Sequence, residues 1–282
     1  MNRRLALRGL LLAVGLLVLL AAGVLLSFFL LPAPQVAVVR VEGDIWGSYA
    51  TVLRDALDQV AQDRAVRAVV LDISSPGGEV TASEDLYYQV LALRRERPVV
   101  ASIGEMAASG AYYLAAAADA IYAKPGSTVG NIGVISILPD PDVVDEKIIT
   151  SGPFKLSGGS HMDAIRQIEM LKQTFLAAIL AQRGDRLQVT PEVLSEGNVY
   201  VGLRAQQMGL VDEVGSRSDA IRAAARLAGL RRYEVVDLTP ELPEAMDIFG
   251  LRLEGVKTAA VLAAPPENLL PGFYYRYVDP LP

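Results

Sequence analysis

Short apolar runs that alternate with amphipathic segments are the feature that most limits the folds open to this chain. The runs have the length and composition of buried strands and lie at residues 36–41, 66–73, 98–103, 120–123 and 234–238. Segments with the spacing of amphipathic helices lie between them, at residues 49–61, 80–95, 107–118, 162–183, 203–208 and 218–228. Because strands and helices alternate, we predict a mostly parallel sheet with helices on its faces and right-handed crossovers.

The N-terminal segment has the features of a membrane anchor. Residues 10–31 carry no charge and are almost wholly apolar, and a helix needs about 20 such residues to cross a bilayer. Arg3, Arg4 and Arg8 precede this run, so the positive-inside rule places the N-terminus in the cytoplasm and the rest outside the cell membrane. A cleaved signal peptide is the alternative, but the run ends without a small-residue cleavage site.

The remainder divides into two parts. Residues 32–239 contain the strand and helix patterns and are expected to form one α/β domain. A further short strand is expected at residues 147–150, beyond the glycine-rich segment 126–133. Residues 240–282 are rich in proline and show little periodicity, so we predict a tail that is partly disordered.

Composition excludes several classes of function. The chain has no cysteine, which rules out disulfides, thiolate catalysis and cysteine-ligated zinc. It has one histidine, His161, so a site with two histidine ligands is impossible within one chain, and we predict neither a metal nor a cofactor. The formal net charge is −6, and the part after the anchor is more acidic still. An acidic surface argues against nucleic acid as a partner.

Residues 74–79 follow a predicted buried strand and open a predicted helix. Gly77 and Gly78 are adjacent, and without side chains their backbone N–H groups can approach another molecule closely. Unpaired N–H groups at a helix start favour negative charge, as an oxyanion hole requires. Taken by itself, this segment is more typical of a plain turn between a strand and a helix.

Ser109 lies among small residues in a second segment, residues 106–113, that also joins a predicted strand to a predicted helix. Ala108 and its alanine neighbours leave room for a substrate backbone, and Gly110 can offer its N–H beside the serine oxygen. A serine that caps an alanine-rich helix would give the same pattern. Both segments, however, follow neighbouring parallel strands, where open α/β sheets bind their ligands.

In these segments the chain resembles the signal peptide peptidase A family, serine peptidases with the Clp protease and crotonase type of α/β fold. The resemblance extends from about Val36 to Gly229 and is carried by residues 73–78, 106–113, 117–123, 128–134, 199–202 and 209–215. It implies that Ser109 is the nucleophile and that the N–H groups of Gly78 and Gly110 form the oxyanion hole.

A serine hydroxyl needs a base before it can act as a nucleophile. In the resembled family this base is a lysine in a Ser-Gly-x-x-Lys pattern, and residues 151–155 match it, which implies Lys155. A lysine becomes a base only when it is buried, and Phe154, Leu156 or a bound substrate is expected to bury it. The alternative is an ordinary surface lysine. His161 is expected to be an exposed residue in a loop or at a helix start.

The chain departs from the family pattern between residues 134 and 151, after Lys155 and at Asn198. These departures concern substrate preference and the placement of the lysine more than the type of reaction.

The resemblance implies a membrane-anchored Ser-Lys endopeptidase that degrades remnant signal peptides or unfolded membrane-associated peptides, as a homo-oligomer without ATP. We expect an extended peptide to add as a strand beside Gly77, Glu79 and Val80, with Ala108 lining a small apolar pocket. Two alternatives remain. One is a Ser-Lys protease for a specific membrane protein, as in stomatin operons. The other is a non-catalytic scaffold or acyl-CoA-binding protein on the same fold.

Overall fold

A computed structural model describes residues 3–30, 33–137, 151–152, 154–155, 157–240 and 272–276. Over these residues the main sheet has eight strands, in the order β10-β1-β2-β4-β5-β9, with β6 beside β4 and β8 beside β6. All neighbouring strands are parallel except β6 and β8. The strands are β1 (Gln35–Glu42), β2 (Val66–Ser75), β4 (Val99–Ala108), β5 (Ala120–Ala123), β6 (Thr128–Gly130), β8 (Val199–Val201), β9 (Glu213–Val214) and β10 (Glu234–Asp237).

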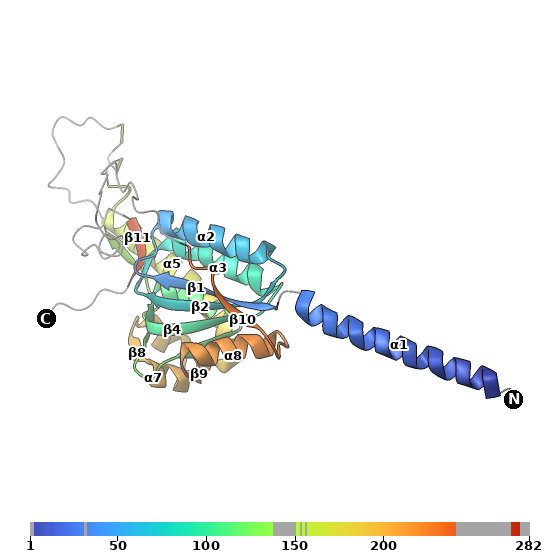
Figure 1. Ribbon diagram of the computed structural model, residues 1–282. Helices are drawn as coiled ribbons and strands as arrows, with labels where there is room; N and C mark the ends of the chain where they lie inside the picture. The colour runs from blue at the N-terminus through green and yellow to red at the C-terminus, as the bar shows by residue number, and fades with distance from the viewer. Residues whose placement is uncertain are drawn as a thin grey trace, which may run out of the picture.

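Helices cover both faces of this sheet (Figure 1). On β1, Ala37, Val39 and Val41 pack on the face covered by α2 to α5, whereas Val36 and Val38 pack against α8. Successive side chains of a strand point to opposite faces, and both faces of β1 are buried, which explains its continuous apolar sequence. The helices of the domain are α2 (Gly47–Gln62), α3 (Val80–Arg94), α4 (Gly110–Ala116), α5 (His161–Arg183), α6 (Pro191–Ser195), α7 (Gly202–Gln207) and α8 (Arg217–Leu227), with a 3₁₀ turn, η2, at Gly184–Arg186.

Two helices begin at a serine–aspartate capping box. The hydroxyl oxygens of Ser160 and Ser216 accept hydrogen bonds from the backbone N–H groups of Asp163 and Asp219, at the starts of α5 and α8. In return the serine hydroxyl and N–H groups donate to the carboxylates, which holds the pKa of both aspartates below the usual range. Both boxes satisfy first-turn donors, and the observed starts lie within one residue of the predicted ones.

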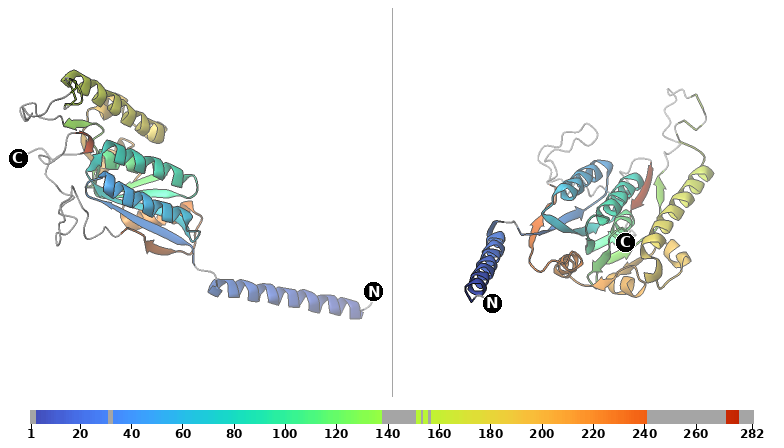
Figure 2. Two further views of the ribbon diagram at one scale, coloured as in Figure 1. Left: turned by 90° about the horizontal axis from the view of Figure 1, so that it is seen from above. Right: turned by 90° about the vertical axis from the view of Figure 1, so that its right-hand side faces the viewer.

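Helix α1 (Arg3–Leu30) projects away from the domain (Figures 1 and 2). Its described leucines and valines are exposed, from Val14 at 52% to Leu12 at 75%. Among the described residues, no helix combines the length and the hydropathy that a bilayer-spanning segment requires.

The structure corrects the helix predicted at residues 107–118. Strand β4 continues to Ala108, and α4 begins only at Gly110 and ends at Ala116. Residues 106–108 pair with β6, and Ala107 also pairs with Ser75 of β2. The backbone of this alanine-rich stretch is therefore committed to a sheet ladder, which overrides its helical propensity.

A second, three-stranded sheet lies beside the first and was not predicted. Its strands are β3 (Gly77–Glu79), β7 (Ile135–Ile137) and, between them, β11 (Gly272–Arg276), antiparallel to both. β11 belongs to the segment 240–282, which the sequence analysis predicts to be a partly disordered tail and to which it assigned no strand. Residues 241–271 and 277–282 lie outside the described residues, as does the strand predicted at 147–150.

Candidate active site

The two glycine- and alanine-rich segments, residues 74–79 and 106–113, meet at the carboxyl ends of two central strands of the main sheet. β2 and β4 are parallel neighbours, with Ile73 opposite Ile103 and Ser75 opposite Ala107. The chain leaves β2 into β3 and leaves β4 into α4, and β3 lies against α4. The prediction that both segments follow neighbouring parallel strands is therefore confirmed. Open parallel sheets bind their ligands at these carboxyl ends of the strands.

Ser109 has a strained backbone at the junction of β4 and α4. Its φ of 53° and ψ of −123° lie in a region that residues other than glycine rarely adopt, at a cost of about 1–3 kcal/mol. The residue is 1% exposed, and its side chain makes no capping hydrogen bond to α4. The helix-cap interpretation of this serine is therefore wrong. A strained serine between a strand and a helix is the geometry of a nucleophile elbow.

The conformation of Ser109 is held by its backbone neighbours. Its N–H donates to the carbonyl oxygen of Gly130 at 2.8 Å, and its own carbonyl accepts from the N–H of Tyr113 at 2.9 Å. Gly130 has a φ of 111°, and a Cβ there would lie 3.0 Å from the carbonyl oxygen of Asn198 and 3.2 Å from the Tyr200 ring. The sequence analysis gave Gly130 no individual role. Its signals were its place in the glycine-rich segment 126–133 and in residues 128–134, one of the stretches that resemble the family.

Gly78 is required by close backbone contact. A Cβ at this position would lie 2.1 Å from the carbonyl oxygen of Ile45. Ile45 also donates its N–H to the carbonyl of Gly77 and accepts from the N–H of Glu79, at 2.8 and 2.9 Å. Because alternate residues of a strand present their backbone groups to opposite edges, the N–H and C=O of Gly78 face away from Ile45.

The other residues predicted to bind substrate or the oxyanion lie at the ends of β3 and β4 and at the starts of α3 and α4. Gly110 is the first residue of α4, so its N–H belongs to the first-turn donors that lack an intrahelical partner. Ala108 ends β4 and is fully buried. The carboxylate of Glu79 accepts from the N–H of Gly47 at 2.8 Å and so fixes the start of α2. Val80 begins α3 and is buried in the core at 4% exposure, so its side chain serves packing.

Lys155 lies on an exposed turn, and its N–H donates to the carbonyl of Gly152. The expected burial by Phe154 is absent, because that side chain is 52% exposed. Leu156 lies outside the described residues. Within the part of the chain that the structure describes, no hydrogen bond or ion pair joins the Lys155 ammonium to another residue, so no described contact links it to Ser109. His161 is exposed at the start of α5, as predicted.

Over the described ranges, no three histidine, aspartate or glutamate side chains come together as metal ligands would.

Comparison with known proteins assigns the family. The model of Peptidase family S49 matches residues 92–231. A predicted protease of Methanocaldococcus jannaschii is 34% identical over 209 residues, which cover 69% of this chain and 66% of that protein. A predicted protease of Synechocystis is 30% identical over 226 residues, which cover 75% of this chain and 81% of that protein. The chain belongs to peptidase family S49. Relatives that carry the signal peptide peptidase A name also match, among them one from Enterococcus faecium that is 26% identical over 195 residues, which cover 64% of this chain and 57% of that protein. The resemblance to the signal peptide peptidase A family is confirmed.

Some S49 relatives are much longer. Protease 4 of Haemophilus influenzae is 30% identical over 236 residues, which cover 72% of this chain but only 36% of that protein. Among solved structures, a mutant of the 1510-N membrane-bound stomatin-specific protease matches with a TM-score of 0.50 and 16% identity, covering 75% of this chain and 100% of that one. At this identity the likeness concerns the α/β fold alone.

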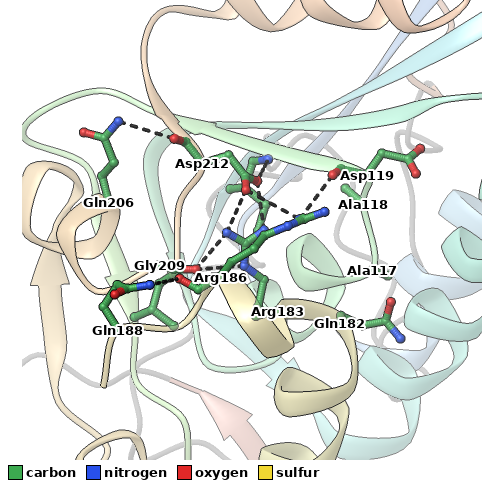
Figure 3. Close-up of polar contacts among 12 residues, drawn as sticks. Ala117, Ala118, Asp119, Gln182, Arg183, Arg186, Gln188, Gln206, Gly209 and Asp212 are labelled. Atoms are coloured by element: carbon green, nitrogen blue, oxygen red, sulfur yellow. Dashed lines mark hydrogen bonds and ion pairs between the residues drawn. The ribbon is translucent and has the colours of Figure 1, made fainter. Parts of the chain in front are cut away.

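A buried arginine holds the loop that contacts the helix following Ser109 in this S49 domain. Arg183, at the end of α5, donates to the carbonyl of Gly209 and forms a two-pronged ion pair with Asp212, with N–O distances of 2.8 and 3.0 Å (Figure 3). Its side chain is fully buried. Between these two partners, the carbonyl of Leu210 accepts a 2.9 Å hydrogen bond from the Tyr112 hydroxyl of α4. Burial raises the pKa of Tyr112 above its usual range, so this hydroxyl remains a donor.

Proposed function

We propose that this S49 protein is a serine endopeptidase with Ser109 as its nucleophile. The observation that carries the proposal is the strained backbone of Ser109, whose side chain does not cap the helix that follows it. Strain of this kind persists only where the surrounding structure enforces it, and it is common at active sites. Two hydrogen bonds supply that enforcement: the Ser109 N–H donates to the Gly130 carbonyl, and the Ser109 carbonyl accepts from the Tyr113 N–H.

In the proposed reaction Lys155 removes the hydroxyl proton of Ser109, and the serine oxygen attacks the peptide carbonyl carbon. The N–H groups of Gly78 and Gly110 stabilise the resulting oxyanion. The carbon–nitrogen bond then breaks, the lysine returns the proton to the leaving amine, and an acyl-enzyme remains. Water activated by the same lysine releases the acyl group. Because Lys155 is exposed in the free chain, a bound substrate or a neighbouring subunit must bury it.

The proposed substrates are extended peptides, such as signal peptide remnants or unfolded segments near a membrane. The backbone of Gly78 faces away from Ile45 and offers its groups to another strand. Strand addition along residues 77–79 uses these groups, and it selects extended chains over folded ones. Homo-oligomeric assembly is part of the proposal, because it would bring a second subunit to the exposed turn at Lys155.

We also propose that residues 10–31 anchor the protein in the cell membrane, with the domain outside. The exposed apolar side chains on α1 and the three arginines that precede the run support this location. An anchored site would lie close to the bilayer, where signal peptide remnants concentrate.

Labelling with a fluorophosphonate probe tests the nucleophile and its base. The full chain should be labelled, Ser109→Ala should not, and Lys155→Ala should be labelled at least about a hundredfold more slowly, because a base contributes about 10²–10⁴-fold. His161→Ala is the control and should match the unsubstituted protein. Labelling of Ser109→Ala at the original rate would overturn the assignment, and a collapse in His161→Ala would make histidine the base.

A further inference from the structure

Three segments of the domain are basic, although the protein as a whole is acidic. Residues 62–67, 94–98 and 226–235 together hold eight arginines and three acidic residues, a formal charge of +5, whereas the whole chain has −6. None of the three segments contains a lysine. We call these three segments the basic end of the domain, because they lie together at the end that carries α1.

Hydrogen bonds bring the segments together around the first residues after α1. The N–H of Gln35 donates to the carbonyl of Ala65 at 2.8 Å, and the N–H of Glu234 donates to the carbonyl of Pro34 at 3.0 Å. The guanidinium of Arg97 donates to the carbonyl of the first residue of β2 at 2.9 Å. The basic end is therefore the end where β1, β2, β4 and β10 begin and from which α1 projects (Figure 1).

Most arginines of the basic end are available to a partner. Five of them are exposed, namely Arg64, Arg67, Arg95, Arg226 and Arg231. Over the described residues, no ion pair joins any of these five to a carboxylate. Nearby acidic residues bind other groups, since Asp63 accepts from the N–H of Ala65 and Glu96 pairs with Arg97. A planar guanidinium matches the geometry of a phosphate and can bind it through two hydrogen bonds.

The short connection to α1 limits how far the basic end can lie from a membrane. Pro34 follows Leu30, the last residue of α1, by four residues, and four residues span at most about 14 Å. If α1 crosses a bilayer, the basic end must therefore lie close to the headgroups on the side that carries the domain. Attraction between arginines and anionic lipids acts over about 8 Å at physiological ionic strength.

We infer that the basic end is a docking surface for anionic phospholipid headgroups, which holds the domain against the membrane beside its anchor. The inference rests on the proposed membrane location of α1 and is independent of the peptidase chemistry. Arginines also bind acidic proteins, but the membrane is the partner that the short connection to α1 would bring to this end.

The test measures how close the basic end lies to the lipid when the full chain is reconstituted into nanodiscs. Because the chain has no cysteine, Gln62→Cys, at an exposed residue that ends α2, provides a single site for a donor dye. A lipid labelled on its headgroup is the acceptor, and single-molecule energy transfer separates docked from free domains. Discs of phosphatidylcholine alone are compared with discs that also contain phosphatidylglycerol.

Two double variants, each with the dye site, remove the same charge from different places. Arg64→Gln with Arg231→Gln changes the basic end. Arg166→Gln with Arg204→Gln is the matched control, at exposed arginines of α5 and α7. The N–H of Leu203, beside Arg204, donates to the carbonyl of Pro125, so α7 begins beyond the carboxyl end of β5, away from the basic end.

We expect a docked population in the anionic discs and not in the neutral ones. It should disappear in 1 M salt, where charge interactions reach only about 3 Å. The substitutions at the basic end should lower the ratio of docked to free domains about 25-fold, because each arginine near an anionic surface contributes about fivefold. The control variant should keep the original ratio.

Equal energy transfer in neutral and anionic discs, or an equal loss in the two variants, would contradict the inference. If the substitutions at the basic end instead reduce the mass of an assembly while transfer is the same in both lipids, the surface is a contact between subunits and the inference is wrong. A chain that does not enter the discs would reject the anchor and this docking with it. Failure of the serine probe to label Ser109 would reject the peptidase alone.

Discussion

At the scale of single residues, the candidate site depends on backbone positions that only particular residues can occupy. Ser109 accepts a strained conformation, and Gly78 and Gly130 stand where a side chain would collide with a neighbouring backbone or ring. The serine and the two glycines are coupled through β2, β4 and β6, since each lies at or just beyond the end of one of these strands. A substitution at either glycine should therefore change the backbone position of Ser109.

Gly130→Ala should slow labelling of Ser109 about 10–100-fold, because misplacing a reacting group by about 1 Å can cost that much. The added Cβ would press on Asn198 and Tyr200 and displace the carbonyl that holds the Ser109 N–H. Probe labelling rates of the full chain give the measurement.

Gly229→Ala is the matched control for this substitution. Gly229 also has a positive φ, 68°, but no atom lies within 4 Å of an added Cβ. It should lose about 1 kcal/mol of stability through strain alone and keep the original labelling rate. If both variants lose labelling equally, strain at Gly130 acts through general destabilisation and not through Ser109.

At the scale of elements, α4 is positioned by contacts remote from the active-site edge. Tyr112 ties it to the carbonyl of Leu210, and Arg183 holds the same loop through Gly209 and Asp212. Asp212 also accepts from the N–H of Ile121, at the second residue of β5. The loop from 209 to 212 thus joins α5, α4 and the sheet.

Arg183→Ala should lower the free energy of unfolding by about 3–5 kcal/mol, since it breaks a buried ion pair by removing one partner. Arg183→Lys should recover only part of this loss, because an ammonium cannot reproduce the two-pronged contact with Asp212. Urea denaturation of the detergent-solubilised full chain, followed by the fluorescence of Trp46, measures both.

Arg166→Ala is the control on the same helix. Arg166 pairs with Asp163 three residues away, and its side chain is 69% exposed. Exposed helix pairs contribute only about 0.3–0.5 kcal/mol. A loss at Arg183 as small as that at Arg166 would show that the network does not stabilise the domain.

At the scale of the whole molecule, helix α1 projects from one end of the domain, and strand β11 pairs with β3 and β7 at the other end. α1 joins the domain where β1 begins, and β11 lies at the opposite end, beside the candidate active site (Figure 1). If α1 is an anchor, it tethers the domain by the end remote from that site.

The full chain should remain with the membrane pellet after alkaline carbonate extraction. The double substitution Leu16→Arg with Leu19→Arg should release it, because each arginine near a helix centre opposes insertion by about 2.5–3.5 kcal/mol. Leu203→Arg, at a 51% exposed leucine of the domain, is the control and should stay in the pellet. Release of the unsubstituted protein by carbonate would reject the anchor.

Local sequence was sufficient to predict most of the long elements. The strands at 36–41, 66–73 and 120–123 and the helices at 80–95 and 162–183 were located closely, because continuous apolar runs and helical spacing are properties of the segment itself. The same patterns predicted that Ser109 and the glycines at residues 77–78 follow neighbouring parallel strands, as they do. Their roles in the site were implied by the family resemblance and stay predictions.

Tertiary structure alone decided the rest. Ala107 and Ala108 became part of a strand, although alanine favours a helix, because their ladder partners are Ser75 and residues 129–130. The strain at Ser109 depends on Gly130 in another strand, and β11 exists through pairing with residues 77–79 and 135–137, far away in the chain. Strands this short bury too little surface to be stable by themselves. Whether such strands form depends on the strands they pair with, and the local sequence pattern does not indicate which distant segments those are.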